Sequence, residues 1–485
     1  MLIQFITNLV TAWWQRSKHT PDVYRERLEL TPFHPLPDTG YLVGGAVRDA
    51  LLNRPVSDID WLVPNPKQLA KQVADASAGS LVCLDETRNV WRVVTNLVDE
   101  NSADNISTRD YVPLETALED DLKTRDFTLN AIATDLDGVI YDPLNGRQDI
   151  ANKQIRAIHM DNFCADPLRL LRGVRLACQL GFKLEPKTYK MMLEVARSQR
   201  AGQTPRPARE RVASELNAIL LTPLAAWGVG LLDGLKLLDL YLPELTEGRG
   251  LVQGGYHHLD VLDHSIEALR QLLLGFPDAS LALRWGTLLH DVGKPSCHTH
   301  DPDTGKTHFY GHDKAGARLG KQILQRLCQP NTVVHEASEL VRYHMLRLPK
   351  TDKAIRRFIH RRRHILPDLL KVMLADREAA RGKQSSRAAR QAYRLAVSRI
   401  LAVQDLAVQD QEAPAPLLSG QEVMALLELD PGPKVGEALR FLAEARAVGD
   451  VHNKDDAMRA LLSYADKQGW LDDGDNSARN DSATH

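Results

Sequence analysis

Two aspartates in one apolar stretch have the spacing of paired metal ligands. Asp58 and Asp60 lie in residues 56–63, VSDIDWLV, a run whose composition predicts a β-strand. Side chains at positions i and i+2 lie on one face of a strand, so the two carboxylates are expected side by side. Such neighbours repel each other unless they share protons or a cation, and Mg2+ suits hard oxygen ligands. The spacing therefore predicts a magnesium site, with an ordinary pair of surface carboxylates as the alternative.

A glycine turn precedes this pair. Residues 41–43, YLV, have strand character and stop at Gly44 and Gly45, which let the backbone turn and approach a ligand closely. The following amides open a helix that suits triphosphate oxygens, and Arg48 in that helix can donate paired hydrogen bonds to phosphate. This combination resembles the nucleotidyltransferase signature of the DNA polymerase β superfamily. The resemblance implies phosphoryl transfer, in which two Mg2+ ions held by the two aspartates activate a hydroxyl and stabilise the leaving pyrophosphate.

Two further segments carry charged residues at helical spacing. Residues 118–131 and residues 164–176 are each predicted to form a helix, the first entered by an acidic turn and the second opened by a proline. Solvated surface charges are the alternative explanation for both segments. The candidates for ligand contacts in these helices are Arg125, Asp126, Asn130, Asp166, Arg169 and Arg172. Asp110 is a candidate for a third metal-binding carboxylate, with an ordinary surface position as its alternative.

The order of these motifs identifies a more specific resemblance. GGAVRD at 44–49, DID at 58–60, RDFTLNA at 125–131 and DPLNG at 142–146 resemble the head domain of class II tRNA nucleotidyltransferases and of bacterial poly(A) polymerases. The resemblance implies that Asp166 and Arg169 select the incoming base without a nucleic-acid template. A carboxylate accepts from the exocyclic amine of cytosine or adenine, and a guanidinium donates to the neighbouring ring acceptor.

Two positions depart from the family pattern. Ala165 stands where the family commonly has Glu, and Thr124 stands where it commonly has a second Arg before the Asp-Phe pair. The missing glutamate is expected to loosen the orientation of Arg169. It therefore stays open whether the chain adds all three nucleotides of a CCA end or only C or A.

Histidines and aspartates recur once per predicted helix in residues 257–376. A His-Asp doublet at the end of an apolar helix, with further such residues on other helices, is how nitrogen and carboxylate ligands converge on a divalent metal. The pattern resembles the HD phosphohydrolase domain and implies attack of metal-bound water on phosphodiesters, with a vestigial fold as the alternative. The expected ligands are His264, His290, Asp291 and Asp376, and His312 and His344 complete a second metal site or contact phosphate.

Composition limits the remaining possibilities. A chain of 485 residues is too long for one core, and its net charge of −2 excludes a uniformly basic nucleic-acid binder while allowing local basic patches. Five cysteines without a CxxC motif favour a reduced cytoplasmic setting. The apolar N-terminal segment is too short to span a bilayer and is expected to pack on the protein. Residues 381–394 form a basic run, which is either a solvated helix face or a surface for RNA phosphates.

The expected fold is multidomain α+β, with a polymerase-β-like nucleotidyltransferase head of mixed sheet and helices followed by all-α neck, HD and tail domains. The resemblance implies a tRNA nucleotidyltransferase that adds C and A from CTP and ATP with Mg2+, needs no membrane, and carries a divalent metal of unspecified identity in the HD domain. A poly(A) polymerase, a partial CC- or A-adding enzyme, and an HD phosphodiesterase with an RNA-binding head are the alternatives. The expected parts are an N-terminal helical extension (1–30), the head (31–152), the neck (153–250), the HD domain (251–400), a tRNA-binding tail (401–471) and a disordered end (472–485).

Overall fold

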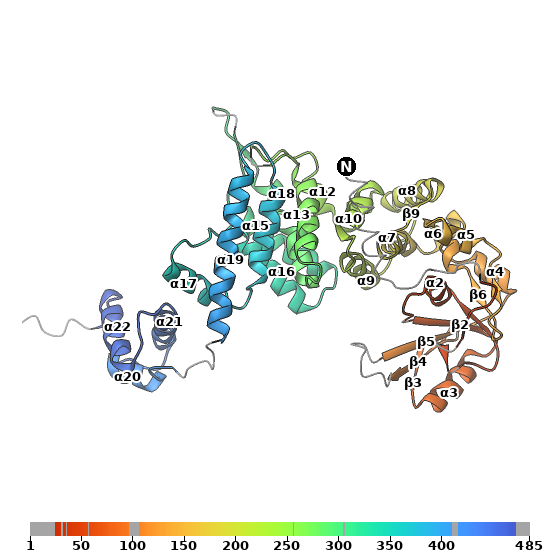
Figure 1. Ribbon diagram of the computed structural model, residues 1–485, viewed down its shortest axis with the longest axis horizontal. Helices are drawn as coiled ribbons and strands as arrows, with labels where there is room; N and C mark the ends of the chain where they lie inside the picture. The colour runs from red at the N-terminus through yellow and green to blue at the C-terminus, as the bar shows by residue number, and fades with distance from the viewer. Residues whose placement is uncertain are drawn as a thin grey trace, which may run out of the picture. The chain divides into compact units, whose positions relative to one another are not determined.

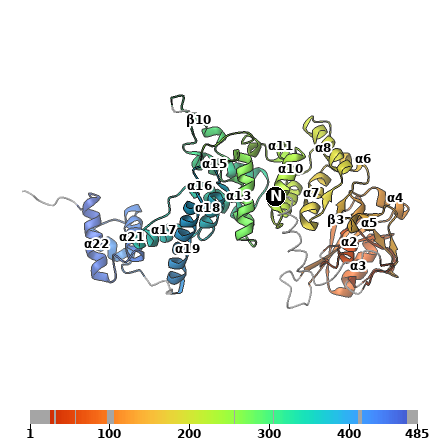
Figure 2. The ribbon, with the colours of Figure 1, turned by 45° about the horizontal axis from the view of Figure 1, so that its top comes forward.

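The computed structural model describes residues 25–30, 33–34, 36–56, 58–96, 106–255, 257–303, 306–409 and 416–471. Two compact units divide the chain (Figures 1 and 2). The first comprises Met1–Glu247 with Gln322–Asn331, and the second comprises Gly248–Lys321 with Thr332–His485. Most of the predicted N-terminal helix, most of the proline-containing segment at 410–416 and the predicted disordered end lie outside the described residues.

A seven-stranded mixed sheet forms the head in the first unit, with strand order β3-β4-β5-β2-β1-β6-β7. The strand that carries the aspartate pair, β2, pairs antiparallel with β1 and parallel with β5, so it is an interior strand. Its alternation buries Ile59 and Trp61, while Asp58 and Asp60 lie on the opposite face. The strands are β1 Tyr41–Val43, β2 Asp58–Val63, β3 Ser80–Asp85, β4 Val90–Asn96, β5 Ile106–Pro113, β6 Ala133–Thr134 and β7 Ile140–Tyr141.

The helices of the first unit follow the sheet strands in two groups. Those of the head are α2 Gly45–Leu51, α3 Pro66–Ser77, α4 Leu118–Lys123, η2 Thr128–Asn130 and α5 Gly146–Ala151. The neck helices are α6 Met160–Ala165, α7 Leu168–Leu180, α8 Pro186–Arg200, α9 Arg209–Leu220, α10 Ala225–Gly234, α11 Leu238–Tyr241 and α12 Pro243–Thr246, with the short strands β8 Gln154–Ile155 and β9 Lys183–Leu184.

The second unit is helical apart from one short hairpin. It contains α13 Val261–Gly275, α14 Leu281–Leu289, η3 Pro295–Cys297, β10 Thr299–His300, β11 Thr307–His308, most of α15 His312–Arg326, α16 Asn331–Tyr343, α17 Asp352–Arg362, α18 Asp368–Ala379, α19 Arg387–Gln409, α20 Gly420–Leu427, α21 Pro433–Ala447 and α22 Lys454–Lys467. The predicted fold class, a mixed-sheet head followed by helical domains, is confirmed.

Two helix predictions were wrong in detail. Residues 118–131 do not form one helix, because α4 ends at Lys123 and the chain then turns so that Phe127, which is fully buried, bridges to Ala157. Residues 164–176 are likewise interrupted, because α6 ends at Ala165 and α7 begins only at Leu168. Both breaks move charged side chains away from the helix faces on which the sequence had placed them.

Candidate active site and metal centre

Three carboxylates share one face of the head sheet. Asp58 and Asp60 lie on β2, and the parallel register of β5 sets Asp60 opposite Asp110. Thr108, opposite Asp58, donates a hydrogen bond of 3.0 Å to that carboxylate. Arg92 on β4 pairs with both oxygens of Asp110, at 2.6 and 2.7 Å. The pair predicted from the sequence therefore lies in a cluster of three acids and one arginine.

Asp60 points toward the glycine turn. Gly44 has φ of 77°, a conformation that favours glycine, and a Cβ atom built there would lie 3.6 Å from Asp60 Oδ2 and 3.0 Å from Arg125 Nη1. Burial raises the pKa of the Asp60 carboxyl, Arg125 opposes this effect, and Asp110 raises the pKa further. A buried carboxylate whose charge is disfavoured by acidic neighbours suits a divalent cation, so this donor set fits the predicted Mg2+ site.

A buried chain of polar contacts leads from the glycine turn to the neck. Arg48, of which 8% is exposed, donates to Asn130 Oδ1 at 2.6 Å and to both oxygens of Asp49. Asn130 in turn donates to Asp126 Oδ1 at 2.9 Å, and Asp126 Oδ2 lies 2.8 Å from Arg172 Nε on α7. The contacts join the turn, η2 and α7 into one framework.

These polar contacts change the interpretation of Asp126. Its carboxylate was expected to reach a nucleotide, but only 6% of the residue is exposed. It accepts from the Phe127 amide and from Asn130, and it forms an ion pair with Arg172. Burial raises the pKa of Asp126, but Arg172 and the two hydrogen bonds outweigh that effect and lower it overall. We infer that Asp126 positions Asn130 and Arg172, whose other groups remain candidates for nucleotide contacts.

The replacement Asp126→Asn should destabilise the first unit by about 1 to 2 kcal/mol, because it removes the charge of a buried carboxylate that accepts two hydrogen bonds and pairs with the half-buried Arg172. The lowered pKa adds a pH dependence. Stability from the ionised carboxylate is present above the unfolded pKa of about 4 and is lost as pH falls through the lower folded pKa. Urea unfolding between pH 7 and pH 3 should show this acid-side loss in the wild type and a smaller loss in the variant. Equal midpoints for the two proteins at pH 7 would contradict the assignment.

The two predicted base-selecting residues lie at the start of α7 and are held by protein groups. Asp166 precedes the helix, and its Oδ2 accepts from Arg211 at 2.8 Å while Oδ1 accepts from the Leu168 amide at 3.2 Å. Arg169 donates to the carbonyl oxygens of Thr124 at 2.7 Å and Asn162 at 3.2 Å. Asp166 is therefore a residue before the helix, not a member of a helical stripe.

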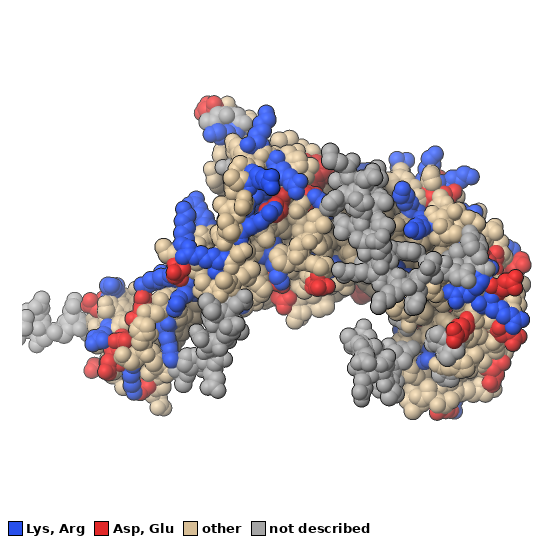
Figure 3. Space-filling view, in the orientation of Figure 1, with Lys and Arg blue, Asp and Glu red and all other residues tan. Residues whose placement is uncertain are grey.

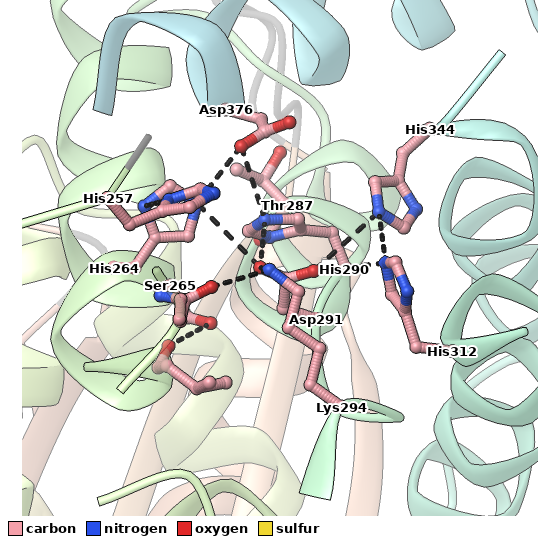
Figure 4. Close-up of polar contacts among 12 residues, drawn as sticks. His257, His264, Ser265, Thr287, His290, Asp291, Lys294, His312, His344 and Asp376 are labelled. Carbon is pink, nitrogen blue, oxygen red and sulfur yellow. Dashed lines mark hydrogen bonds and ion pairs between the residues drawn. The ribbon is translucent and has the colours of Figure 1, made fainter. Parts of the chain in front are cut away.

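A second cluster, in the second unit, gathers the predicted HD residues (Figure 4). We call His264, His290, Asp291, His312, His344 and Asp376 the HD centre. His264 Nε2 lies 3.0 Å from Asp376 Oδ1 and 3.7 Å from Asp291 Oδ2, and His290 Nε2 lies 3.1 Å from the same Asp291 oxygen. These four residues converge from α13, from the end of α14 and from α18. They form one candidate set of metal ligands.

His312 and His344 complete a second set around the other oxygen of Asp291. Their Nε2 atoms lie 3.5 and 3.7 Å from Asp291 Oδ1 and 3.3 Å from each other. Ligand atoms of His264, His290 and Asp291 lie within 4.8 Å of one another, and so do those of Asp291, His312 and His344. One carboxylate therefore belongs to two triads and could offer one oxygen to a divalent ion in each.

The hydrogen bonds behind the ligands orient the Nε2 atoms toward this carboxylate. The Nδ1 atoms of His290, His312 and His344 each contact a backbone carbonyl, of Thr287, Phe309 and Val341 respectively, at 2.7 to 2.8 Å. Because a carbonyl only accepts, each Nδ1 carries a proton, which leaves Nε2 as the ring atom that would bind a metal ion. His290 Nε2 is buried and has no hydrogen-bond partner among the described residues. This donor set fits divalent metals.

The charges around Asp291 also favour a metal site. Burial raises the pKa of Asp291, but His290 and Lys294 hold it well below its usual range, so the carboxylate remains ionised. Lys294 lies 2.6 Å from Asp291 Oδ2 and also donates to Gln253 at 2.5 Å. Burial lowers the pKa of His257, beside His264, to about 3, so this ring stays neutral.

Four residues that hold the site carboxylates in place were not predicted from the sequence. Arg92 and Arg211 each hold a predicted site carboxylate, and Lys294 with Gln253 holds Asp291. The contact of Lys294 with Asp291 could have been predicted, because Lys294 follows the His-Asp doublet by about one turn. The arginines had none, because their partners depend on the order of strands and helices in space.

Models of known families match three parts of the chain. A Poly A polymerase head domain matches residues 40–156, a probable RNA and SrmB-binding site of polymerase A matches residues 181–248, and an HD domain matches residues 255–381. These matches include both clusters described above. They place a nucleotidyltransferase head and an HD domain in one chain, and both families are metal-dependent.

Curated relatives match along almost their whole length. An A-adding tRNA nucleotidyltransferase of Deinococcus radiodurans is 51% identical over 446 residues, which cover 92% of this chain and 99% of the relative. A CC-adding tRNA nucleotidyltransferase of Thermus thermophilus is 42% identical over 433 residues, which cover 89% and 95%. The chain therefore belongs to the tRNA nucleotidyltransferase family, and it is a nucleotidyltransferase.

Solved structures support the fold independently. The Bacillus stearothermophilus CCA-adding enzyme in complex with CTP matches with a TM-score of 0.59 at 22% identity, covering 89% of this chain and 94% of that one. The Thermotoga maritima CCA-adding enzyme, complexed with tRNA, matches with a TM-score of 0.55 at 18% identity, covering 88% and 91%. Within the described residues, the helices lack any stretch that is both long and apolar enough to cross a bilayer.

Proposed function

We propose that this chain adds the terminal A to the 3′ end of tRNA, using ATP and Mg2+ in the cytoplasm. The observation that carries the proposal is the set of carboxylates on β2 and β5, of which Asp60 faces the glycine turn. The two relatives matched along nearly their full length are named for single activities, A-adding and CC-adding. We therefore replace the expectation that one chain adds both C and A, and the higher identity to the A-adding relative favours A.

The proposed chemistry assigns a role to each group at the head. Asp58 and Asp60 hold Mg2+, which when bound activates the tRNA hydroxyl and neutralises the charge developing at the α-phosphate. Asp110 lies opposite Asp60 and is the candidate third carboxylate. Gly44 leaves room for the triphosphate beside Asp60, and Gly45, Arg48 and Arg125 line the same turn.

Base selection is proposed for Asp166 and Arg169. For adenine, the carboxylate would accept from the exocyclic amine and the guanidinium would donate to the adjacent ring nitrogen. Guanine and uracil present a carbonyl where the amine is needed, so the carboxylate would face an acceptor instead of a donor, which disfavours these bases. The contacts of Asp166 with Arg211 and of Arg169 with Thr124 must be exchanged for contacts with the base.

The proposal is tested with tRNA transcripts that end before the CCA sequence, after the first C and after both C residues. Each transcript is incubated with ATP or CTP, and the products are sized by gel electrophoresis. We expect one A to be added to the transcript ending in CC, at a rate at least about 100-fold above that of any other combination, because a site that hydrogen-bonds its substrate can discriminate by about 10,000-fold. Addition of C to the shorter transcripts would assign the CC-adding activity instead, and a ladder of A residues would assign poly(A) polymerase.

A second activity is proposed for the HD centre, namely metal-dependent hydrolysis of phosphodiesters. The observation that favours it is that Asp291 belongs to two triads of ligand atoms. Divalent metal held there would supply a nucleophilic water at neutral pH. Lys294, held between Asp291 and Gln253, keeps the bridging carboxylate ionised and in place.

A further inference from the structure

An arginine-lined pocket lies where α18 passes into α19. It has a volume of about 460 Å³ and is lined by Glu378, Arg381, Arg387, Arg390, Gln391 and Arg394, which we call the arginine pocket. Figure 3 shows basic side chains gathered over these two helices in the second unit. Four guanidinium groups surround one carboxylate, so the pocket has an excess of positive charge.

The only carboxylate among the pocket's lining residues, that of Glu378, already pairs with arginine side chains. Glu378, of which 9% is exposed, accepts from Arg394 through both oxygens at 2.7 Å, and Arg390 lies 3.9 Å away. Arg390 also donates to the Ser385 carbonyl at 2.8 Å. These contacts fix one wall of the pocket.

Two arginines remain available to a ligand. The Arg381 side chain has one hydrogen bond, from its Nε to the Glu378 carbonyl at 3.3 Å, and its terminal nitrogens have no hydrogen-bond partner among the described residues. Glu267, which interacts electrostatically with Arg381, is already held by Arg270 at 2.6 Å. Arg387 has no hydrogen bond or ion pair within the described parts of the chain, and it is exposed. Planar guanidinium donors with uncommitted nitrogens match the oxygens of phosphate.

The arginine pocket and the HD centre share helix α18. Glu378 follows the HD ligand Asp376 by two residues and therefore lies on another side of that helix. Helix α18 packs against α13, on which Glu267, which interacts electrostatically with Arg381, follows His264 by one turn. The backbone N–H of Gln384, which lies between Arg381 and Arg387 in the sequence, donates to the Gly255 carbonyl at 3.0 Å. Gly255 is two residues from Gln253, which contacts Lys294 beside the HD centre. The pocket residues are distinct from the candidate metal ligands, so one phosphate group does not fill both places.

We propose that the arginine pocket binds a backbone phosphate of an oligonucleotide whose scissile phosphate lies in the HD centre. The inference rests on the proposed HD activity and narrows its substrate class from phosphodiesters in general to nucleotide chains with more than one phosphate. Arg381 and Arg387 are the specificity-determining residues of this pocket. They contact a phosphate that does not react, so they act on substrate binding and not on the hydrolytic step.

The test uses the full chain loaded with Mn2+ and a ladder of oligouridylates that carry one to four phosphates, each with a terminal p-nitrophenyl phosphodiester. For the wild type, kcat/KM should rise at least about tenfold at the substrate length at which a backbone phosphate reaches the pocket. A tenfold rise corresponds to about 1.4 kcal/mol of binding free energy. The change should appear in KM, with kcat unchanged. The double variant Arg381→Gln/Arg387→Gln should lose this step and hydrolyse the one-phosphate substrate as the wild type does.

The control is Arg318→Gln, which removes an exposed arginine of α15 that does not line the pocket, and it should keep the step. The inference would be overturned if kcat/KM of the wild type did not change with substrate length, or if the double variant kept the tenfold rise. Absence of hydrolysis on every rung would overturn the HD activity instead. In that case, fluorescence anisotropy with labelled uridylates of the same lengths tests the pocket, because the tenfold step must then appear in Kd and vanish in the double variant.

Discussion

Replacing Asp60 by Asn should lower the rate of nucleotide addition to tRNA by about 1,000-fold. The carboxylate faces the glycine turn, 3.6 Å from where a Cβ of Gly44 would lie, and it shares the sheet face with Asp58 and Asp110. Loss of a metal ligand removes several kcal/mol of transition-state stabilisation, and each 1.4 kcal/mol corresponds to about tenfold in rate. Single-turnover extension of tRNA ending in CC with saturating ATP measures the effect.

The matched control is Asp75→Asn, on the exposed face of α3 in the same unit. It should extend tRNA at the wild-type rate, which separates loss of a metal ligand from loss of surface charge. Since Asn has nearly the size of Asp, the Asp60 variant is expected to unfold at the wild-type midpoint. An Asp60 variant that is folded and within tenfold of the wild-type rate would remove this residue from the reaction.

Replacing Asp291 by Asn should abolish divalent metal binding at the HD centre while leaving nucleotide addition within about twofold of the wild type. Asp291 offers one oxygen to each triad, so a single substitution weakens both sites. Hydrolysis of a phosphodiester at this centre should fall by about 1,000-fold on the same metal-stabilisation argument. Metal content of the purified protein, measured by mass spectrometry, and hydrolysis rate are the readouts.

This variant also leaves Lys294 buried without an ionised partner, at a cost of about 3 to 5 kcal/mol. His344→Gln is therefore a necessary second variant, because it removes one ligand nitrogen and keeps the contact between Asp291 and Lys294. It should lose metal from the second triad alone. Wild-type metal content in both variants would show that the HD centre is a structural remnant.

Local patterns in the sequence predicted the parts of the sites that depend on neighbouring residues. Asp58 and Asp60 share a face because a strand alternates, and the turn at Gly44 needs a positive φ that glycine supplies. The His-Asp doublet was predictable because it ends an apolar helix. In each case a few consecutive residues determine the geometry.

Contacts between distant segments could not be predicted in this way. The pairing of Asp110 with Asp60 depends on the parallel register of β5 with β2, and no local signal sets that register. The inward turn of Asp126 depends on the burial of Phe127 against the segment around Ala157, which overrides the helical pattern. Tertiary packing of this kind decides which of the charged residues becomes structural and which remains available to substrate.

The most direct test of the central claim is transfer of label from α-32P ATP to tRNA ending in CC, measured in parallel for four proteins. The account predicts that the wild type and Asp291→Asn label the tRNA by one nucleotide and that Asp58→Asn and Asp60→Asn do not. Labelling by the two head variants at the wild-type rate, or its loss in Asp291→Asn while the head variants keep it, would show that the chemistry is not carried by the carboxylates of β2.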